Sequence, residues 1–243
     1  MKDLPVLAQE RSLTIEPRKK RLEVILKVAE RCNINCTYCY FFNGADDSFR
    51  FHPPSISKAT ITNVAEFLSQ GAIDQKLENI QIDFHGGEPM LLGKKRFSQI
   101  CTYLQSSVGT VTKLTLCMQT NATLIDSEWV DLFEQHQIHV GVSLDGPAEY
   151  HDAERIDFRG KGTYDRVIRG IRLLQEAQKR IGEVGVLCVI NPRHSAGRIY
   201  RHFVDDLHIN GMDFLLPDIT HTNFIDGNPE EYGNFCVMFL MNG

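Results

Sequence analysis

The chain has 243 residues, of which 42% are hydrophobic and 23% are charged, and its formal net charge is −5. These values are ordinary for one globular domain with a sizeable core, and the negative balance gives no electrostatic reason to bind nucleic acid or an anionic membrane. Residues 1–10 lack the apolar segment of a signal peptide, and no run approaches the roughly 18 apolar residues of a membrane span. Seven cysteines, three of them clustered, fit a reducing compartment and a metal site better than a disulfide framework, so we expect a cytoplasmic protein.

Residues 1–21 form a polar lead-in, and from residue 22 onward strand and helix patterns alternate. Short segments rich in Val, Ile, Leu or Thr and bounded by Gly, Pro or Asn predict six strands: Leu22–Ala29, Ile80–His85, Lys113–Gln119, Ile138–Leu144, Glu183–Ile190 and Met212–Leu216. Between and after them, apolar residues recur at helical spacing: Ser57–Leu68, Phe97–Leu104, Asp126–Phe133, Tyr164–Leu174, Ile199–Leu207 and Pro229–Met238. Six βα units predict an α/β domain over 22–243 with a parallel sheet and right-handed crossovers. Periodicity alone allows either an open doubly wound sheet or a partial (β/α)6 barrel.

Polar residues gather where the predicted strands end. The first strand leads into a long cysteine loop, and the later ones lead into His85–Pro89, Thr120–Thr123, Ser143–Pro147 and Asn191–Pro192. In parallel α/β folds the carboxyl ends of the strands form one rim that carries the working residues. We therefore expect these segments to converge.

The cysteine loop carries Cys32, Cys36 and Cys39 in a C-x3-C-x2-C arrangement. Three thiolates can bind three irons of a [4Fe–4S] cube, which leaves one iron without a protein ligand and open to a small molecule. The cysteines alone would also fit a zinc site in which His52 supplies the fourth ligand. Their place after the first strand, with Gly86-Gly87-Glu88 after the second, favours the iron–sulfur interpretation.

Together these motifs resemble the radical S-adenosylmethionine (SAM) enzymes, over about residues 22–227. The phrases His85–Pro89, Thr120–Leu124 and Val142–Pro147 are similar to the branch that modifies peptides, which includes the anaerobic sulfatase maturases of the SPASM type. The stretch Cys39–Asn43 is similar to maturases that form cyclophane crosslinks. The resemblance implies a TIM-like partial barrel that binds a [4Fe–4S] cluster and SAM. It also implies reductive cleavage of SAM to a 5′-deoxyadenosyl radical, which removes a hydrogen atom from a precursor peptide before the crosslink forms.

The resemblance also implies roles for individual residues. Cys32, Cys36 and Cys39 would ligate the cluster, and an external flavodoxin-like or ferredoxin-like protein would supply the electron. The residues implied in SAM binding are Tyr38, Gly86, Gly87, Glu88, Ser143, Arg155 and Asn191. Glu88 would accept a hydrogen bond from the SAM ammonium, and Ser143 and Arg155 would bind its carboxylate. His85 and Asn121 would touch the peptide, and no protein acid or base is assigned.

Simpler interpretations exist for most of these residues. Gly86-Gly87 could be only a tight turn, and Ser143 and Asp145 could serve a βα turn before Pro147. Arg155 alone could be a surface charge, His85 an interior histidine, and Asn121 or Asn191 the start of a loop. The remaining cysteines suit packing in the core: Cys101, Cys117, Cys188 and Cys236.

The sequence departs from the peptide-modifying branch at its end, because only Cys236 follows the sixth strand and one thiol cannot hold an auxiliary cluster. We therefore expect a core that is truncated after the sixth βα unit. The apolar run Phe235–Met241 would then belong to an interface or an incomplete protein. Three functions stay open: a peptide maturase, a homologue that binds cluster and SAM without modifying a peptide, and a non-catalytic metal-binding or peptide-binding module.

Overall fold

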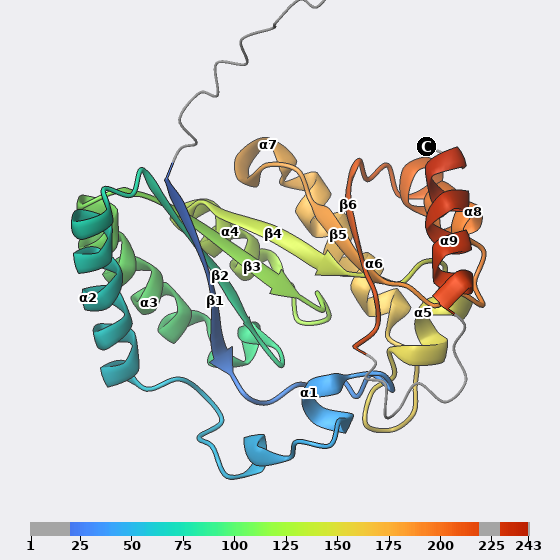
Figure 1. Ribbon diagram of the computed structural model, residues 1–243, viewed down its shortest axis with the longest axis horizontal. Coiled ribbons are helices and arrows are strands. Elements are labelled where there is room, and N and C mark those ends of the chain that lie inside the picture. The colour runs from blue at the N-terminus through green and yellow to red at the C-terminus, as the bar shows by residue number, and fades with distance from the viewer. Residues whose placement is uncertain (1–19, 219–228, 243) are drawn as a thin grey trace, which may run out of the picture.

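The computed structural model describes residues 20–218 and 229–242. It contains a six-stranded parallel sheet whose strands follow one another in chain order (Figure 1). The strands are β1 (Arg21–Ala29), β2 (Asn79–Gly86), β3 (Lys113–Thr120), β4 (Ile138–Ser143), β5 (Gly185–Val189) and β6 (Gly211–Leu215). All six predicted strands are confirmed, and their ends differ from the prediction by at most two residues.

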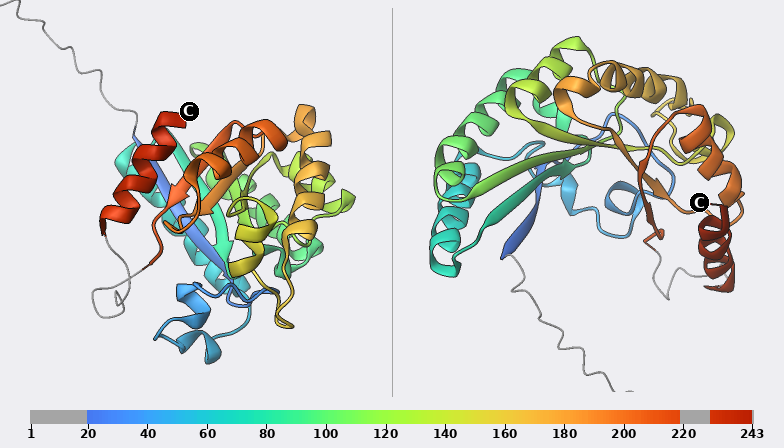
Figure 2. Two further views of the ribbon diagram at one scale, coloured as in Figure 1. Left: turned by 90° about the vertical axis from the view of Figure 1, so that its right-hand side faces the viewer. Right: turned by 90° about the horizontal axis from the view of Figure 1, so that it is seen from above.

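The strand order decides between the two folds that periodicity left open. A doubly wound sheet reverses its order at a switch point, whereas here each strand pairs with the next one along the chain. The sheet is strongly curved, and α2, α3, α4, α6 and α8 lie along its convex side (Figure 2). The chain is therefore a partial (β/α)6 barrel.

The structure describes helices between and after the strands, and two of the longer ones begin at a side-chain cap. The helices are α1 (Tyr40–Asn43), α2 (Lys58–Gln75), α3 (Lys94–Ser107), α4 (Ser127–His136), α5 (Ala148–Glu154), α6 (Tyr164–Glu176), α7 (Gln178–Ile181), α8 (Ala196–Arg201) and α9 (Pro229–Asn242). Ser57 caps α2 by accepting a hydrogen bond from the Thr60 amide, and Asp126 caps α4 through the Trp129 amide. The predicted helix at Ile199–Leu207 is divided, because α8 continues as the π-helical turn His202–Asp206.

The core lies between the convex face of the sheet and these helices. Alternate residues of β2 are fully buried there, including Ile80, Ile82 and Phe84. The Phe84 ring packs edge-on against Phe97 of α3 with 5.1 Å between centroids, and Phe97 in turn contacts Trp129 of α4. Each fully buried large apolar side chain contributes about 1.5–3 kcal/mol, so this layer stabilises the packing of α3 and α4 against the sheet.

The concave face is less filled by side chains. Gly141, Gly185 and Gly211 are paired in register across β4, β5 and β6, and they line a cavity of about 470 Å³ together with Gln119 and Asp213. The interior of a closed barrel is normally packed by layers of branched side chains. Here the three glycines leave room on the inner wall.

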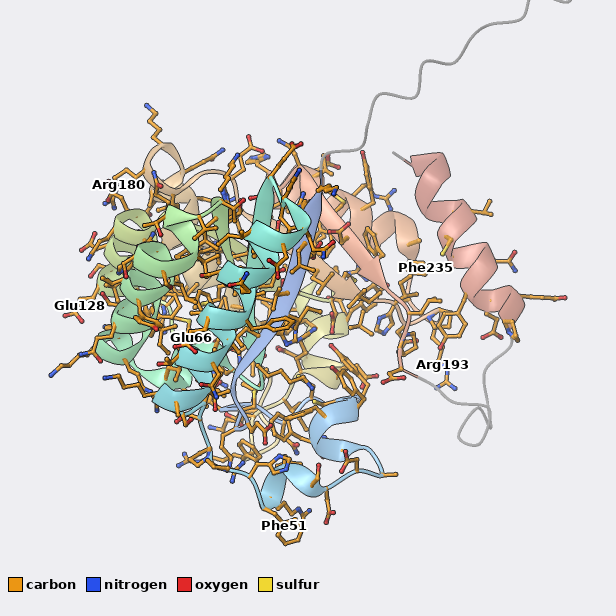
Figure 3. All side chains as sticks on the ribbon, turned by 60° about the vertical axis from the view of Figure 1, so that its left-hand side comes forward. Phe51, Glu66, Glu128, Arg180, Arg193 and Phe235 are labelled. Carbon is orange, nitrogen blue, oxygen red and sulfur yellow. The ribbon has the colours of Figure 1, made fainter. Side chains whose placement is uncertain are left out.

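The ends of the chain are described in part. Most of the predicted lead-in, residues 1–19, lies outside the described residues, and β1 begins at Arg21. In the predicted C-terminal apolar run, Phe235 is buried in the core, while Val237 and Met238 are exposed (Figure 3). The side chains from residue 239 onward lie outside the described part. Among the described helices, none combines the length and the apolar character needed to cross a bilayer.

Candidate functional site

The three clustered cysteines lie on the loop between β1 and α1 and face one cavity. This cavity of about 220 Å³ is lined by Cys32, Cys36 and Cys39 together with residues from the ends of β2 to β6. Backbone hydrogen bonds join the loop to the segment after α5, from the Asn35 amide to the Ile156 carbonyl (2.7 Å) and from the Thr37 amide to the Glu154 carbonyl (2.9 Å). The tip of the same long connection, at Phe51, points outward and is 83% exposed (Figure 3).

The chemistry of these donors suits an iron–sulfur cluster. Burial raises the pKa of the Cys32 thiol to about 12 and also raises that of Cys36, so the thiolates form only when a metal displaces their protons. Within residues 20–218 and 229–242, no three His, Cys, Asp or Glu side chains converge closely enough to bind a single ion. A cube instead takes each sulfur at a different iron, so its ligands surround a larger group. His52, the zinc alternative, instead faces Glu30, with 2.8 Å between its Nδ1 and the Glu30 Oε2.

Gly86 and Gly87 allow the end of β2 to approach the end of β1 very closely. Gly86 has a φ of 133°, and a Cβ added there would lie 2.1 Å from the Ala29 carbonyl oxygen. A Cβ on Gly87 would lie 2.3 Å from the Arg31 carbonyl oxygen, and the Gly87 amide donates to Ala29 at 2.8 Å. Both glycines line the cysteine cavity, so their lack of side chains serves the backbone contact and leaves the cavity open.

Glu88, expected to accept a hydrogen bond from the SAM ammonium, faces groups of the protein in this structure. Its carboxylate is fully buried, is not among the groups that line the cavity, and accepts three hydrogen bonds from the protein. The donors are the Met90 amide (3.1 Å), the Thr120 hydroxyl (2.7 Å) and the Asn121 amide (2.8 Å). Burial raises its pKa to about 7, against the opposing effect of these donors. Glu88 therefore joins the turn after β2 to the end of β3.

The two residues expected to touch a substrate, His85 and Asn121, both line the cysteine cavity. Burial lowers the pKa of His85, which favours its neutral form. The side-chain nitrogen Nδ2 of Asn121 lies 3.8 Å from the Cys32 sulfur and donates a hydrogen bond to the side-chain oxygen of Asn33 at 2.9 Å. The Asn121 side chain thus joins the end of β3 to the cysteine loop.

Beside Cys36 lies a buried cluster of Tyr38, Asp145 and Arg155. The Arg155 guanidinium contacts Asp145 through Nε (2.8 Å) and Nη2 (3.2 Å), and the Tyr38 hydroxyl also donates to Asp145. Although burial alone would raise it, the charge and hydrogen bonds of Arg155 hold the pKa of Asp145 below its usual range. Burial raises the pKa of Tyr38 well above 10, so its hydroxyl keeps the proton that it donates. Arg155 is 8% exposed, which excludes the surface-charge interpretation.

Asp145 was assigned only a turn role from the sequence, yet it is the centre of this cluster. Besides Arg155 and Tyr38, it accepts a hydrogen bond from the Val189 amide at 3.0 Å. The available signal was an acidic residue directly after a predicted strand, ten positions before an arginine.

Of the remaining residues predicted to bind SAM, Ser143 and Arg155 line the cysteine cavity, whereas Asn191 is not among its lining residues. The Ser143 hydroxyl oxygen accepts from Gln119 at 2.9 Å, which leaves the hydroxyl proton available to a ligand. The third guanidinium nitrogen of Arg155, Nη1, lies 3.9 Å from the Cys36 sulfur. The Asn191 side-chain oxygen accepts from the Arg193 amide, so the simpler interpretation, a loop start, describes it better than an adenosine contact.

The other cysteines lie away from the clustered three. Cys101 and Cys188 are buried, and Cys117 is half-buried, which agrees with the packing role expected for all three. Cys236 of α9 is exposed, so the expectation that it packs in the core is wrong. It faces solvent because the buried side of α9 is the one that carries Phe235.

A partial βα barrel with three cysteines in the loop after its first strand defines the class of protein. The family model of the radical SAM superfamily matches residues 26–202. The chain belongs to this superfamily, whose members use a [4Fe–4S] cluster and SAM.

Similar proteins place the chain near one branch of that superfamily. The serine-type anaerobic sulfatase-maturating enzyme of Bacteroides thetaiotaomicron is 31% identical over 249 residues, which cover 94% of this chain and 59% of that protein. The cysteine-type enzyme of Clostridium novyi is 28% identical over 223 residues, or 89% of this chain and 58% of that protein. The chain thus spans less than two thirds of the length of either relative.

Solved structures share the fold. A structure described as native anSMEcpe with bound AdoMet matches with a TM-score of 0.73 and 24% identity over 91% of this chain and 60% of that one. A structure of the same protein with bound AdoMet and the Cp18Cys peptide matches with a TM-score of 0.70 and 25% identity, over 91% of this chain and 58% of that one. The expected fold class and the expected kinship with sulfatase maturases are confirmed.

Proposed function

We propose that this chain binds a [4Fe–4S] cluster through Cys32, Cys36 and Cys39, cleaves SAM reductively, and modifies a ribosomal precursor peptide. The observation that carries the proposal is the convergence of three thiols on one cavity at the carboxyl rim of the barrel. When bound, the cluster and SAM would supply one-electron cleavage of the sulfonium, which yields methionine and a 5′-deoxyadenosyl radical able to abstract a hydrogen atom.

The residues around the cavity would bind and orient SAM. The Ser143 hydroxyl has a free proton to donate to the SAM carboxylate, and Nη1 of Arg155 is the guanidinium nitrogen that Asp145 does not engage. Because Asp145 already neutralises Arg155, we assign the arginine a geometric role more than a net positive charge. The apolar side chains Leu187 and Val189 line the same cavity and would exclude water from the radical.

A peptide is the substrate class that the surroundings favour. The glycine-lined cavity of β4–β6 shares Gln119 and Leu187 with the cysteine cavity, so a second molecule has room beside SAM. Both relatives named above are sulfatase-maturating enzymes, which supports a protein or peptide substrate. Side-chain crosslinking of the peptide, including cyclophane formation, rests on the sequence phrase Cys39–Asn43. An external one-electron donor and a cytoplasmic location complete the proposal.

The decisive experiment is anaerobic reconstitution of the chain with iron and sulfide, followed by dithionite and SAM. We expect about four irons per chain, a cubane signal by Mössbauer or EPR spectroscopy, and release of 5′-deoxyadenosine. The variant Cys36→Ala should lose both the cluster and 5′-deoxyadenosine, whereas the matched variant Cys236→Ala, changed at the exposed α9 cysteine, should keep both. Persistence of the cubane signal in Cys36→Ala would refute the ligand assignment.

Co-expression with a precursor peptide separates the proposal from its alternatives. A loss of two hydrogens from the peptide, seen by mass spectrometry, supports a crosslinking maturase. Release of 5′-deoxyadenosine with an unchanged peptide supports a homologue that only binds cluster and SAM. A chain that takes up neither iron nor SAM would be a non-catalytic module.

A further inference from the structure

The side-chain amide of Asn121 is held in one orientation by its neighbours. Asn121 follows β3, is 5% exposed, and its Oδ1 accepts hydrogen bonds from the Thr123 amide (3.0 Å) and the Thr123 hydroxyl (2.7 Å). A backbone N–H can only donate, so the atom that faces it must be the oxygen. The nitrogen Nδ2 therefore points the other way, toward Cys32 and Asn33.

Both hydrogens of that nitrogen are directed at the cysteine loop. One is donated to the Asn33 Oδ1 at 2.9 Å, and the other faces the Cys32 sulfur at 3.8 Å. The Asn121 backbone is fixed as well, because its amide donates to the buried carboxylate of Glu88 at 2.8 Å. Because Asn121 is held by Thr123, Asn33 and Glu88, its Nδ2 donor remains in place when the Cys32 thiol becomes a thiolate.

We propose that Asn121 is a positioning residue that donates an N–H···S hydrogen bond to the Cys32 thiolate and thereby raises the reduction potential of the bound cluster. The inference rests on the proposed function, in which Cys32 is a cluster ligand. Reduction adds negative charge that is shared with the ligand sulfurs, so a donor aimed at one of them stabilises the reduced state more than the oxidised state. The asparagine thus makes the cluster easier to reduce.

The test is the midpoint potential of the reconstituted full chain, measured by redox titration with EPR detection in the absence of SAM. Asn121→Ala removes the donor, and we expect its reduction equilibrium constant to fall at least tenfold, which corresponds to about 59 mV for one electron. Asn121→Asp keeps the oxygen that Thr123 requires and replaces the donor by an acceptor. Asn33→Asp is its matched control, because it adds the same charge next to Cys32 and keeps the oxygen that accepts from Asn121. We expect the midpoint potential of the Asn121→Asp variant to lie well below that of the Asn33→Asp variant.

Several results would overturn the inference. One is an Asn121→Ala cluster with the potential of the parent, and another is equal potentials for Asn121→Asp and Asn33→Asp. Loss of the cluster from both Asn121 variants, with Asn33→Asp intact, would show that Asn121 is needed for assembly instead. Failure of the parent chain itself to form a cluster would refute the proposed function, a result distinct from an unchanged potential.

Discussion

Replacing Asp145 by asparagine tests whether the buried cluster beside Cys36 stabilises the fold. The Asp145 carboxylate is 4% exposed and the Arg155 side chain 9%, and two hydrogen bonds of 2.8 and 3.2 Å join them. Asparagine has nearly the same shape but leaves the guanidinium buried without a counter-charge, which costs about 3–5 kcal/mol. For a chain of this size, about 2–4 °C per kcal/mol translates this loss into a melting temperature lower by roughly 6–20 °C.

Circular dichroism during thermal and urea unfolding of the chain without cofactors would measure this effect. The matched control is Glu149→Gln, which breaks the ion pair between Glu149 and Arg198. The two side chains of this pair are 48% and 53% exposed, respectively. Exposed pairs contribute at most about 1 kcal/mol, so the control should unfold almost like the parent. If Asp145→Asn were no less stable than Glu149→Gln, the argument from the buried pair would be wrong.

Two further predictions concern the turn after β2. Because burial raises the pKa of Glu88 from 4.5 to about 7, the native state holds this proton more tightly than the unfolded state, and stability falls by about 3 kcal/mol as pH rises through that interval. The measurement is the difference in unfolding free energy between the parent and Glu88→Gln, from urea titrations at pH 4.5–8. The difference is needed because burial lowers the pKa of His151 to about 3, so that His151 makes the protein more stable as pH rises toward 6.5, which is the opposite trend. A difference that does not vary with pH would refute the prediction. Gly87→Ala should lower stability by more than 2 kcal/mol and reduce iron uptake, because its Cβ would lie 2.3 Å from the Arg31 carbonyl oxygen. Gly71→Ala in α2 is the matched control, because an added Cβ there would meet no neighbouring side chain or element within 4 Å. It should be neutral or slightly stabilising by the same measurements, and similar losses in both variants would contradict the steric argument.

The elements of this fold could be predicted from the sequence because each strand is a short apolar run with clear boundaries. The predicted segment Leu22–Ala29 became Arg21–Ala29, and Glu183–Ile190 became Gly185–Val189. The choice between a doubly wound sheet and a partial barrel was not available from periodicity, because both folds bury their strands with the same pattern. It depends on which strands are neighbours, which is a long-range property.

The three cysteines and the two glycines, which the sequence places at strand ends on one rim, line one cavity in the structure, because motif spacing and strand ends are local features. The direction of a side chain was not predictable in the same way. Glu88 follows Gly86-Gly87 directly, yet its carboxylate faces Thr120 and Asn121, more than thirty residues further along the chain. Arg155 likewise pairs with Asp145 on the other side of α5, and although the two residues lie only ten positions apart, the sequence around them does not show that the pair is buried.

The attachment of the cysteine loop to Glu154 and Ile156 has a consequence for how the protein acquires its prosthetic group. Many small metal-binding modules are unfolded until the metal ion binds, so the free-energy cost of ordering their ligands weakens metal binding. Here the amides of Asn35 and Thr37 already fix the loop to the barrel. The conformational entropy is lost during folding of the polypeptide, which leaves insertion of iron and sulfide as a step that can be reversed and repeated. A molecule stripped by oxygen could then be refilled without being rebuilt.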